Sequence, residues 1–162
     1  MPKGNETSIT STFSARTAGD GDVMVLHRLM DELYSEDPNI ADLPRPDISR
    51  TLREFSKLPE KGRLVVLECD GAPCGYAILV FFWSNEYGNN LVEIDEVYVD
   101  SAFRGRGIGG KFFSWLRSEF ADSSAGWTLQ VSHKNRDARR LYERLGFKTS
   151  RNEHMICIFA EQ

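Results

Sequence analysis

The sequence predicts a single α/β domain with a mixed, mainly antiparallel sheet of six to seven strands and about four flanking helices. Three observations lead to this fold class: two early segments have helical periodicity, three consecutive strand-like segments follow with short connections, and helix and strand patterns then alternate. The chain of 162 residues is long enough for one buried core, and 41% hydrophobic with 27% charged residues is typical of a globular protein.

The first third of the chain holds a tail, a strand and two helices. Residues 1–11 are polar, so we expect a flexible tail followed by a domain at 12–162, and residues 13–16 are a candidate first strand. Apolar residues at helical spacing predict a helix over 22–36, formed by Leu26, Leu29, Met30 and Leu33. Asp47 is the expected N-cap of a second helix, whose apolar face carries Ile48, Leu52 and Phe55.

The rest of the chain is first β-rich and then alternating. Segments 64–69, 75–83 and 91–99 are predicted strands, and the Asp70-Gly71 turn and the looser turn at 84–90 make an antiparallel meander the expected arrangement. A helix to about residue 120, a strand at 127–131 and a helix that begins at Asn135 and ends at Gly146 follow. Segments 147–149 and 155–159 are predicted terminal strands.

Composition and charge exclude several classes of protein. A net charge of −4 argues against a general nucleic-acid binder. The longest apolar run, residues 76–83, is too short to cross a bilayer, and the first residues lack the apolar stretch of a secretory signal. We therefore expect a soluble, cytoplasmic protein without membrane or nucleic-acid partners. Cys69, Cys74 and Cys157 lack the spacing of a zinc site or a redox pair, so we expect buried thiols and no metal.

Four glycines lie between the third long strand and the following helix: Gly105, Gly107, Gly109 and Gly110. Backbone without Cβ atoms can curl so that several N–H groups converge, and the helix N-terminus adds partial positive charge, so this loop suits an anion, above all a phosphate. Basic residues gather in this half of the chain, where residues 101–147 hold nine Lys or Arg against four acids. Three of them lie in or directly after the loop: Arg104, Arg106 and Lys111.

Two known phosphate-binding patterns fit this loop only in part. Gly105, Gly107 and Gly110 match the G-x-G-x-x-G pattern of a dinucleotide site, but such a loop follows the first strand of a βαβ unit, whereas this one follows a meander. Residues 105–111 also approach a Walker A loop, yet Phe112 stands where a Ser or Thr must hold magnesium. A glycine-rich turn without any ligand is a further alternative.

A third pattern fits more residues. Arg104-x-x-Gly107-x-Gly109 resembles the R/Q-x-x-G-x-G/A signature of the GNAT superfamily, the acetyl-CoA-dependent N-acetyltransferases. The downstream run Asn135-x-x-Ala138-x-x-Leu141-Tyr142-x-x-x-Gly146-Phe147 resembles the second motif of that superfamily, and the order of elements is similar from about residue 13 to 160. The resemblance implies that an amine attacks the thioester of acetyl-CoA directly, with no acyl-enzyme intermediate. Members are often homodimers, so a homodimer is also an expectation.

The resemblance implies roles for individual residues. The backbone N–H groups of the loop would hold the pyrophosphate of CoA, a set made by Arg104, Gly105, Arg106, Gly107, Ile108, Gly109 and Gly110. The pantetheine arm would lie along the backbone of Val97, Tyr98 and Val99, with the Val97 N–H as oxyanion donor, and Asn135 would contact it from the other side of the cleft. Tyr142 would be the general acid, because its phenol pKa of about 10 is close to that of a thiol. The alternative for Tyr142 is a core tyrosine.

Three carboxylates crowd the strand before the loop, those of Glu93, Asp95 and Glu96. They are the candidates for the general base, because crowded carboxylates raise one another's pKa and attract an ammonium ion. A regular strand would place Glu93 and Asp95 on the face of Val97 and Val99, whereas a bulge, typical of this strand in the superfamily, would favour Glu96. The base can also act through a water molecule, and a solvated strand face is the alternative.

The acceptor is predicted from charge and from the resemblance. In the superfamily the early helices line the acceptor site, and residues 31–47 hold six acids against one arginine, namely Asp31, Glu32, Glu36, Asp37, Asp42 and Asp47. We therefore expect a small cationic amine, such as a polyamine, an aminoglycoside or an amino-acid derivative, with Tyr34, Trp83 and Tyr87 as cation–π contacts. A solubilising helix surface explains the acids equally well. The competing functions are acetylation of a protein N-terminus or lysine, and a non-catalytic acyl-CoA-binding module.

Overall fold

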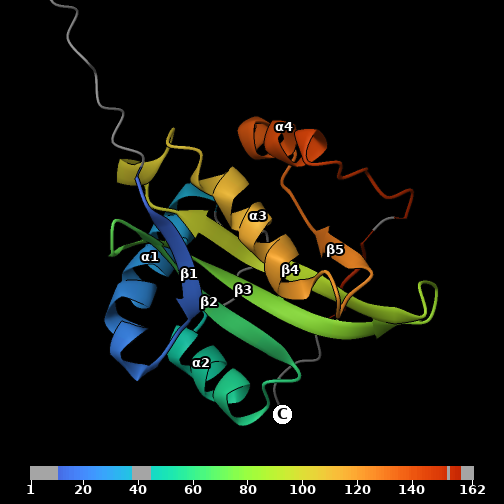
Figure 1. Ribbon diagram of the computed structural model, residues 1–162, viewed down its shortest axis with the longest axis horizontal. Coiled ribbons are helices and arrows are strands. Elements are labelled where there is room, and N and C mark those ends of the chain that lie inside the picture. The colour runs from blue at the N-terminus through green and yellow to red at the C-terminus, as the bar shows by residue number, and fades with distance from the viewer. Residues whose placement is uncertain (1–10, 38–44, 153, 158–162) are drawn as a thin grey trace, which may run out of the picture. The chain divides into compact units, whose positions relative to one another are not determined.

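The computed structural model of the protein describes residues 11–37, 45–152 and 154–157 (Figure 1). The chain forms two compact units, Met1–Gln130 and Val131–Gln162. The expected tail at 1–11 lies outside the described residues apart from Ser11. Within the residues that are described, no helix is long and apolar enough to span a membrane.

The first unit contains the sheet and three of the four α-helices found in the described residues. In chain order its elements are β1 Phe13–Thr17, η1 Asp20–Asp22 (a 3₁₀ helix), α1 Val23–Glu36, α2 Ile48–Lys57, β2 Gly62–Cys69, β3 Ala72–Ser84, β4 Asn89–Val99, η2 Ser101–Phe103 (3₁₀), α3 Ile108–Phe120 and β5 Gly126–Leu129. The second unit contains α4, Arg136–Arg144. The Asp47 side chain accepts a hydrogen bond from the Ser49 N–H at 2.9 Å, so the predicted cap of α2 is confirmed.

The sheet has the strand order β1-β2-β3-β4-β5. The first four strands pair antiparallel, and β5 pairs parallel to β4, so the mixed, mainly antiparallel sheet is confirmed. Asp70 and Gly71, which connect β2 and β3, have φ of +54° and +78°. Both values lie in the left-handed region that two-residue hairpin turns require, and Asp-Gly is a preferred sequence there. The predicted meander therefore forms through local turn chemistry.

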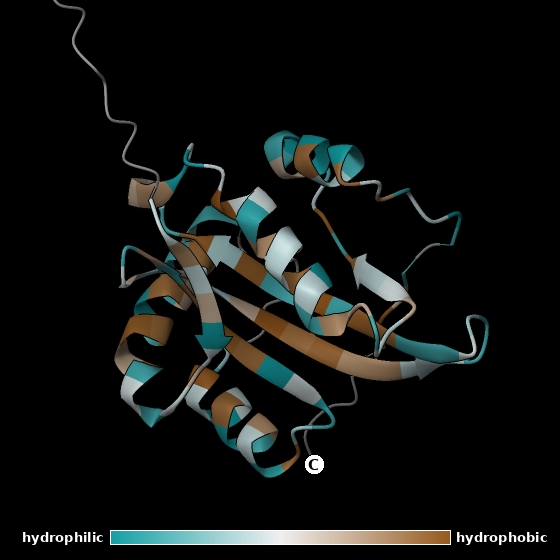
Figure 2. Cartoon of the chain, viewed as in Figure 1, coloured by the Kyte–Doolittle hydropathy of each residue, from teal (hydrophilic) through white to brown (hydrophobic). Residues whose placement is uncertain are grey.

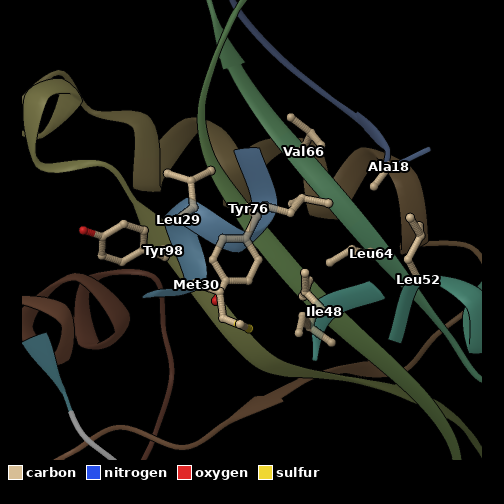
Figure 3. Packing of buried hydrophobic residues seen from close by; sticks show 11 residues of the cluster. Ala18, Leu29, Met30, Ile48, Leu52, Leu64, Val66, Tyr76 and Tyr98 are labelled. Carbon is tan, nitrogen blue, oxygen red and sulfur yellow. The ribbon is translucent and has the colours of Figure 1, made fainter. Parts of the chain in front are cut away.

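One face of the sheet packs against α1 and α2. The cluster joins Leu64, Val66, Tyr76, Ile78 and Tyr98 of the strands to Leu26, Leu29, Met30, Ile48 and Leu52 of the helices. Tyr76 is fully buried and lies in the middle of the labelled side chains (Figure 3). The predicted helical stripes are thus the faces that the helices bury against the sheet.

The other face of the sheet packs against α3. Phe81 follows Ile78 by three positions along β3, so its side chain points to the opposite face, where its ring lies 5.4 Å from the ring of Phe120 in α3. Figure 1 shows α3 lying over the strands, and Figure 2 shows β3 hydrophobic along most of its length. Central strands covered on both faces need such continuous apolar runs.

Two sequence predictions differ from the structure. Residues 147–152 and 154–157 form no strand, so the described residues contain five strands and not six to seven; residues 158–159 of the second predicted strand lie outside the described residues. Met155 and Ile156 are largely exposed. A segment with high β propensity does not form a strand unless it has a partner strand to pair with. Cys69 and Cys74 are buried as expected, but Cys157 is exposed.

Arg16 of β1 joins three elements, and we expect Arg16→Ala to lower the free energy of unfolding by about 1–2 kcal/mol at pH 7. Its Nε donates to Glu68 of β2 at 2.9 Å, and its two terminal nitrogens donate to Asp22 of η1 at 2.8 Å. The hydrogen bond from Arg16 holds the pKa of Asp22 below its ordinary value.

A carboxyl with a lowered folded-state pKa contributes stability above its unfolded-state pKa, and that stability is lost as pH falls through the folded-state value. The difference between wild type and Arg16→Ala should therefore shrink in acid. Urea titrations from pH 7 downward measure it, and a difference that stayed constant would contradict this role for Asp22.

Candidate functional site

The glycine loop connects η2 to α3. Gly105 and Gly107 have φ of +76° and +72°, a region in which other residues are strained, and Gly107 is the N-cap of α3. A Cβ atom at either position would meet no atom within 4 Å, so this part of the loop exposes bare backbone. The first N–H groups of α3 have no intrahelical acceptor. The loop therefore has the backbone geometry of an anion site at a helix N-terminus.

The three basic side chains at the loop already contact protein groups. Arg104 contacts Glu36 and Val99, Arg106 contacts Ala102 and Phe103, and Lys111 contacts Ser11. An anion at this loop would consequently meet mainly backbone N–H groups and the partial charge of the helix N-terminus.

Strand β4 stops pairing with β5 several residues before the glycine loop. The parallel pairing of β4 with β5 ends at Ile94, opposite Leu129. Asp95, the next residue, is a β-bulge, because Ile94 pairs with Leu79 and Glu96 pairs with Ile78 on β3. In the part of the chain that the structure describes, residues 96–99 pair with β3 on one side and with no strand on the other. This open backbone edge can receive an extended ligand as an added strand.

The bulge changes which side chains share a face. Glu93 pairs with Val80 and Glu96 with Ile78, so both carboxylates lie on the α1/α2 face, whereas Val97 pairs with Ala77 on the opposite face. The bulge, and not the regular strand, is the arrangement that β4 adopts, so Glu93 lies on the face of Glu96 and not on that of Val97 and Val99. The extra residue at the bulge shifts the alternation by one position.

Glu96 is held by two tyrosines. The Tyr34 hydroxyl of α1 donates to Glu96 Oε1 and the Tyr76 hydroxyl of β3 donates to Oε2, each at 2.6 Å. Burial, followed by the negative charge of Glu96, raises the pKa of Tyr76, so its phenol stays protonated and able to donate. Such short hydrogen bonds to a charged acceptor are strong and fix the carboxylate in place. The contact between Tyr76 and Glu96 could not be predicted from the sequence, because it depends on the register of β3 against β4.

Asp95 differs from Glu96 in its surroundings. Its side chain is exposed, and it makes no hydrogen bond or ion pair with any described residue. Partial desolvation, and then the negative charges of Glu96 and Glu93, raise the pKa of Asp95. A carboxyl group that is accessible and has a raised pKa is suited to accept a proton from a substrate.

Several acids predicted to line the acceptor site are engaged in ion pairs. Asp31 pairs with Arg45 at 2.8 Å, Glu32 with Arg28 at 2.7 Å and Glu36 with Arg104 at 2.8 Å. Asp47 caps α2, and Asp42 lies outside the described residues. An open pocket of about 570 Å³ is lined by Arg28, Asp31, Glu32, Ser35 and Glu36, which carry both signs of charge. This run of acids therefore adds less negative potential than its composition suggests.

The expected aromatic contacts are not gathered at one place. Tyr34 is half-buried against Glu96, whereas Trp83 and Tyr87 are exposed at the far end of the β3–β4 hairpin. Within the described residues, no group of three or more His, Cys, Asp or Glu side chains is arranged to hold a metal ion.

The second unit carries the other two candidate residues on α4. Asn135 is the N-cap of α4, and its side-chain oxygen accepts from the Ala138 N–H at 3.1 Å. After the helix, Gly146 has φ of +92°, and the Phe147 N–H donates to the Tyr142 carbonyl at 3.0 Å. The rings of Tyr142 and Phe147 lie 5.7 Å apart, and burial raises the pKa of the Tyr142 phenol. The second motif thus encodes both ends of this helix.

Relatives among characterised and uncharacterised proteins share part of the sequence. An uncharacterized N-acetyltransferase of Methanocaldococcus jannaschii is 35% identical over 86 residues, which are 51% of this chain and 38% of that protein. Aminoalkylphosphonate N-acetyltransferase of Salmonella typhimurium is 37% identical over 65 residues, which are 40% of this chain and 42% of that enzyme. The chain therefore spans about two fifths of the length of each of these relatives.

A solved structure matches the fold of this chain, and a family model matches its sequence. The crystal structure of a possible acetyltransferase from Clostridium difficile 630 superposes with a TM-score of 0.75 at 20% identity, covering 91% of this chain and 99% of that one. That likeness agrees with the α/β fold predicted from the sequence. The model of the Acetyltransferase (GNAT) family matches residues 26–147, which include both motifs, the bulged strand and the glycine loop. The chain belongs to the GNAT family of acetyltransferases.

Proposed function

We propose that this protein transfers the acetyl group of acetyl-CoA directly to a primary amine. The observation that carries the proposal is the bulge at Asp95, where β4 parts from β5. The backbone edge of β4 is open after this bulge. The three carboxylates, the open edge and the glycine loop all lie within fewer than twenty consecutive residues. Membership of the GNAT family supports the same reaction.

The described residues fit acetyl-CoA as a substrate. The bare backbone at Gly105 and Gly107 and the first N–H groups of α3 suit the pyrophosphate. The open edge at 97–99 suits the pantetheine arm, which carries amide groups that pair as a strand does. The Val97 N–H is our candidate donor to the oxyanion, and such a donor contributes about 10²–10³ in rate. Asn135 is assigned to the same substrate from the second motif alone.

We assign the general base to Asp95. Its carboxylate takes a proton from the substrate ammonium, and the nitrogen lone pair then forms a bond to the thioester carbonyl carbon. The oxyanion collapses, the carbon–sulfur bond breaks, and the departing thiolate takes a proton from the Tyr142 phenol. The surplus proton on the new amide nitrogen passes through solvent to the tyrosinate, and Asp95 releases its proton to solvent, so both groups return to their starting states. Asp95 is preferred because it is accessible, whereas both oxygens of Glu96 accept hydrogen bonds from tyrosines. Glu93 and Glu96 add negative charge that attracts the ammonium ion.

The acceptor in this proposal is a small amine. The relative from Salmonella is named for an aminoalkylphosphonate, which is a small amine, and this supports the class. Three of the acids in residues 31–47 are ion-paired. Our proposal that the acceptor is cationic therefore depends on the negative charge of Glu93, Asp95 and Glu96. Acetylation of a peptide N-terminus or lysine is the alternative that the assay below separates.

Binding of acetyl-CoA is the first expected result. At a free concentration one hundred times its Kd, acetyl-CoA should stabilise the chain by about 2.7 kcal/mol, whereas NAD and ATP at the same concentration should give no comparable shift. Thermal unfolding measures this. A panel of polyamines, aminoglycosides, aminoalkylphosphonates, amino acids and peptides, assayed for CoA release, then identifies the acceptor class. Stabilisation by acetyl-CoA without turnover of any amine would favour a binding module over an enzyme, and no stabilisation would contradict the proposal.

A further inference from the structure

The Arg104 side chain connects the glycine loop to two other parts of the first unit. Its Nε donates to the Val99 carbonyl at the end of β4 at 2.9 Å. One terminal nitrogen donates to both carboxylate oxygens of Glu36, the last residue of α1, at 2.9 and 2.8 Å. The guanidinium also lies 5.1 Å from the centre of the Tyr98 ring. Arg104 directly precedes Gly105, so these contacts fix the position of the residue from which the glycine loop starts.

Glu36 is itself held from a second side. The Tyr98 hydroxyl donates to Glu36 Oε1 at 2.8 Å, and the Tyr98 ring is buried in the core. An isolated exposed ion pair contributes little to stability because solvent competes for both groups. Here the side chains of the Arg104–Glu36 pair are 45% and 46% exposed, but the carboxylate accepts from the guanidinium and from the phenol of a buried tyrosine together, so it has a second partner that an isolated surface pair lacks.

A second link ties the same segment to α1. Arg28 donates to the Asp100 carboxylate at 2.9 Å, and Asp100, the N-cap of η2, also accepts from the Ala102 N–H at 2.9 Å. The segment 98–104 is therefore joined to α1 at Arg28 and at Glu36, which lie about two turns apart along the helix. The bare-backbone loop starts where this anchored segment ends.

Anchoring matters because glycine backbone has many accessible conformations. A loop whose N–H groups must converge on one anion loses that freedom on binding unless it is ordered beforehand. The contacts of Arg104 restrict the residue immediately before Gly105. If Arg104 turned toward a phosphate instead, the contacts with Val99, Tyr98 and Glu36 would all be lost.

We propose that Arg104 is a positioning residue, held by Glu36 and the Val99 carbonyl, that orders the Gly105–Gly107 backbone for the CoA pyrophosphate rather than binding the phosphate with its own guanidinium. This inference rests on the proposed function for its ligand. It also makes the end of α1 part of the support of the CoA site.

Glu36→Gln distinguishes the two roles by the sign of its effect. A guanidinium that bound phosphate directly would be released by loss of Glu36, and a negative charge near the phosphate would be removed, so acetyl-CoA would bind more tightly. A positioning role predicts weaker binding, because the loop loses an anchor.

The experiment compares Glu36→Gln, Arg104→Gln and the double variant by isothermal titration with acetyl-CoA. Each single variant should raise the Kd about tenfold, as expected for the loss of one hydrogen-bonded charge pair, and the double variant should be no worse than the poorer single variant. With acetyl-CoA saturating, the kcat of Glu36→Gln should change less than twofold. Asp31→Asn is the matched control, because it breaks another 2.8 Å ion pair on α1, with Arg45, and should leave the Kd unchanged.

A ligand-free measurement separates this inference from the proposed function. In ¹⁵N relaxation of the free protein, the order parameters of the Gly105 and Gly107 amides should fall below about 0.6 in Glu36→Gln and stay near wild type in Asp31→Asn. Unchanged loop order, or acetyl-CoA binding that is equal or tighter in Glu36→Gln, would overturn the positioning role. Wild-type protein that failed to bind acetyl-CoA would contradict the proposed function, and the relaxation data would still decide whether Glu36 and Arg104 order the loop.

Discussion

Asp95→Asn should lower kcat by about 10²–10⁴, the range over which a positioned general base contributes. Asn keeps the shape of the side chain but cannot accept the ammonium proton. The measurement is initial-rate CoA release with saturating acetyl-CoA and the best amine of the panel. The Kd for acetyl-CoA should stay within about twofold of wild type, because the backbone edge and the glycine loop are untouched.

Glu96→Gln is the comparison variant for Asp95. The negative charge of Glu96 contributes to the raised pKa of Asp95, so its removal should move the acidic limb of the kcat/KM profile to lower pH. Under the assignment made above, this variant shifts the profile without abolishing turnover. If Glu96→Gln abolished turnover and Asp95→Asn retained it, the base would be Glu96.

The stability of Asp95→Asn provides an internal control. A carboxyl whose folded-state pKa is raised binds its proton more tightly in the folded chain, so stability falls as pH rises from the unfolded-state pKa through the folded-state value. Above that window wild type carries the cost of the charged form and the Asn variant does not. The variant should therefore be at least as stable as wild type at pH 7, and a loss of activity would not reflect unfolding.

Tyr142→Phe should lower kcat by about 10²-fold. Burial raises the pKa of the Tyr142 phenol, so the phenol is protonated at neutral pH, as the assigned role of proton donor requires. Phe keeps the ring that packs 5.7 Å from Phe147, so the end of α4 should be preserved. Turnover and the acetyl-CoA Kd are measured together, and only turnover should change.

Tyr87→Phe is the matched control for that substitution, because Tyr87 is an exposed tyrosine on the β3–β4 hairpin. It removes the same hydroxyl group from an exposed residue and keeps the aromatic ring, so its kcat should equal that of wild type. Unchanged turnover in Tyr142→Phe would remove this residue as the general acid and leave the thiolate to depart unassisted.

The helices and most of the strands were predictable from local sequence. The stripe of Leu26, Leu29 and Met30 marks the buried face of α1, and Asp47 caps α2, because periodicity and capping depend on residues close in the chain. The glycine loop was predictable for the same reason, since its left-handed glycines are local requirements. The terminal strands were not, because a strand needs a partner that its own sequence does not specify.

The candidate site was predictable as a set of residues but not as an arrangement. The three carboxylates of β4 and the loop could be named from their spacing and from the GNAT motifs. The partners of those groups could not, because Tyr76 reaches Glu96 and Glu36 reaches Arg104 across distances of 20 and 68 residues along the chain.

By itself the sequence determined the α/β fold and the GNAT family and indicated the segment to which we assign the chemistry, since all three follow from short-range patterns. Only the tertiary structure decided which charged groups are free and which are engaged. The bulge at Asp95 shifts the alternation of β4, so that Glu96 lies between two phenols while Asp95 stays accessible. Arg104 is likewise engaged by Glu36. A side chain's availability depends on strand register and helix packing, which long-range contacts set.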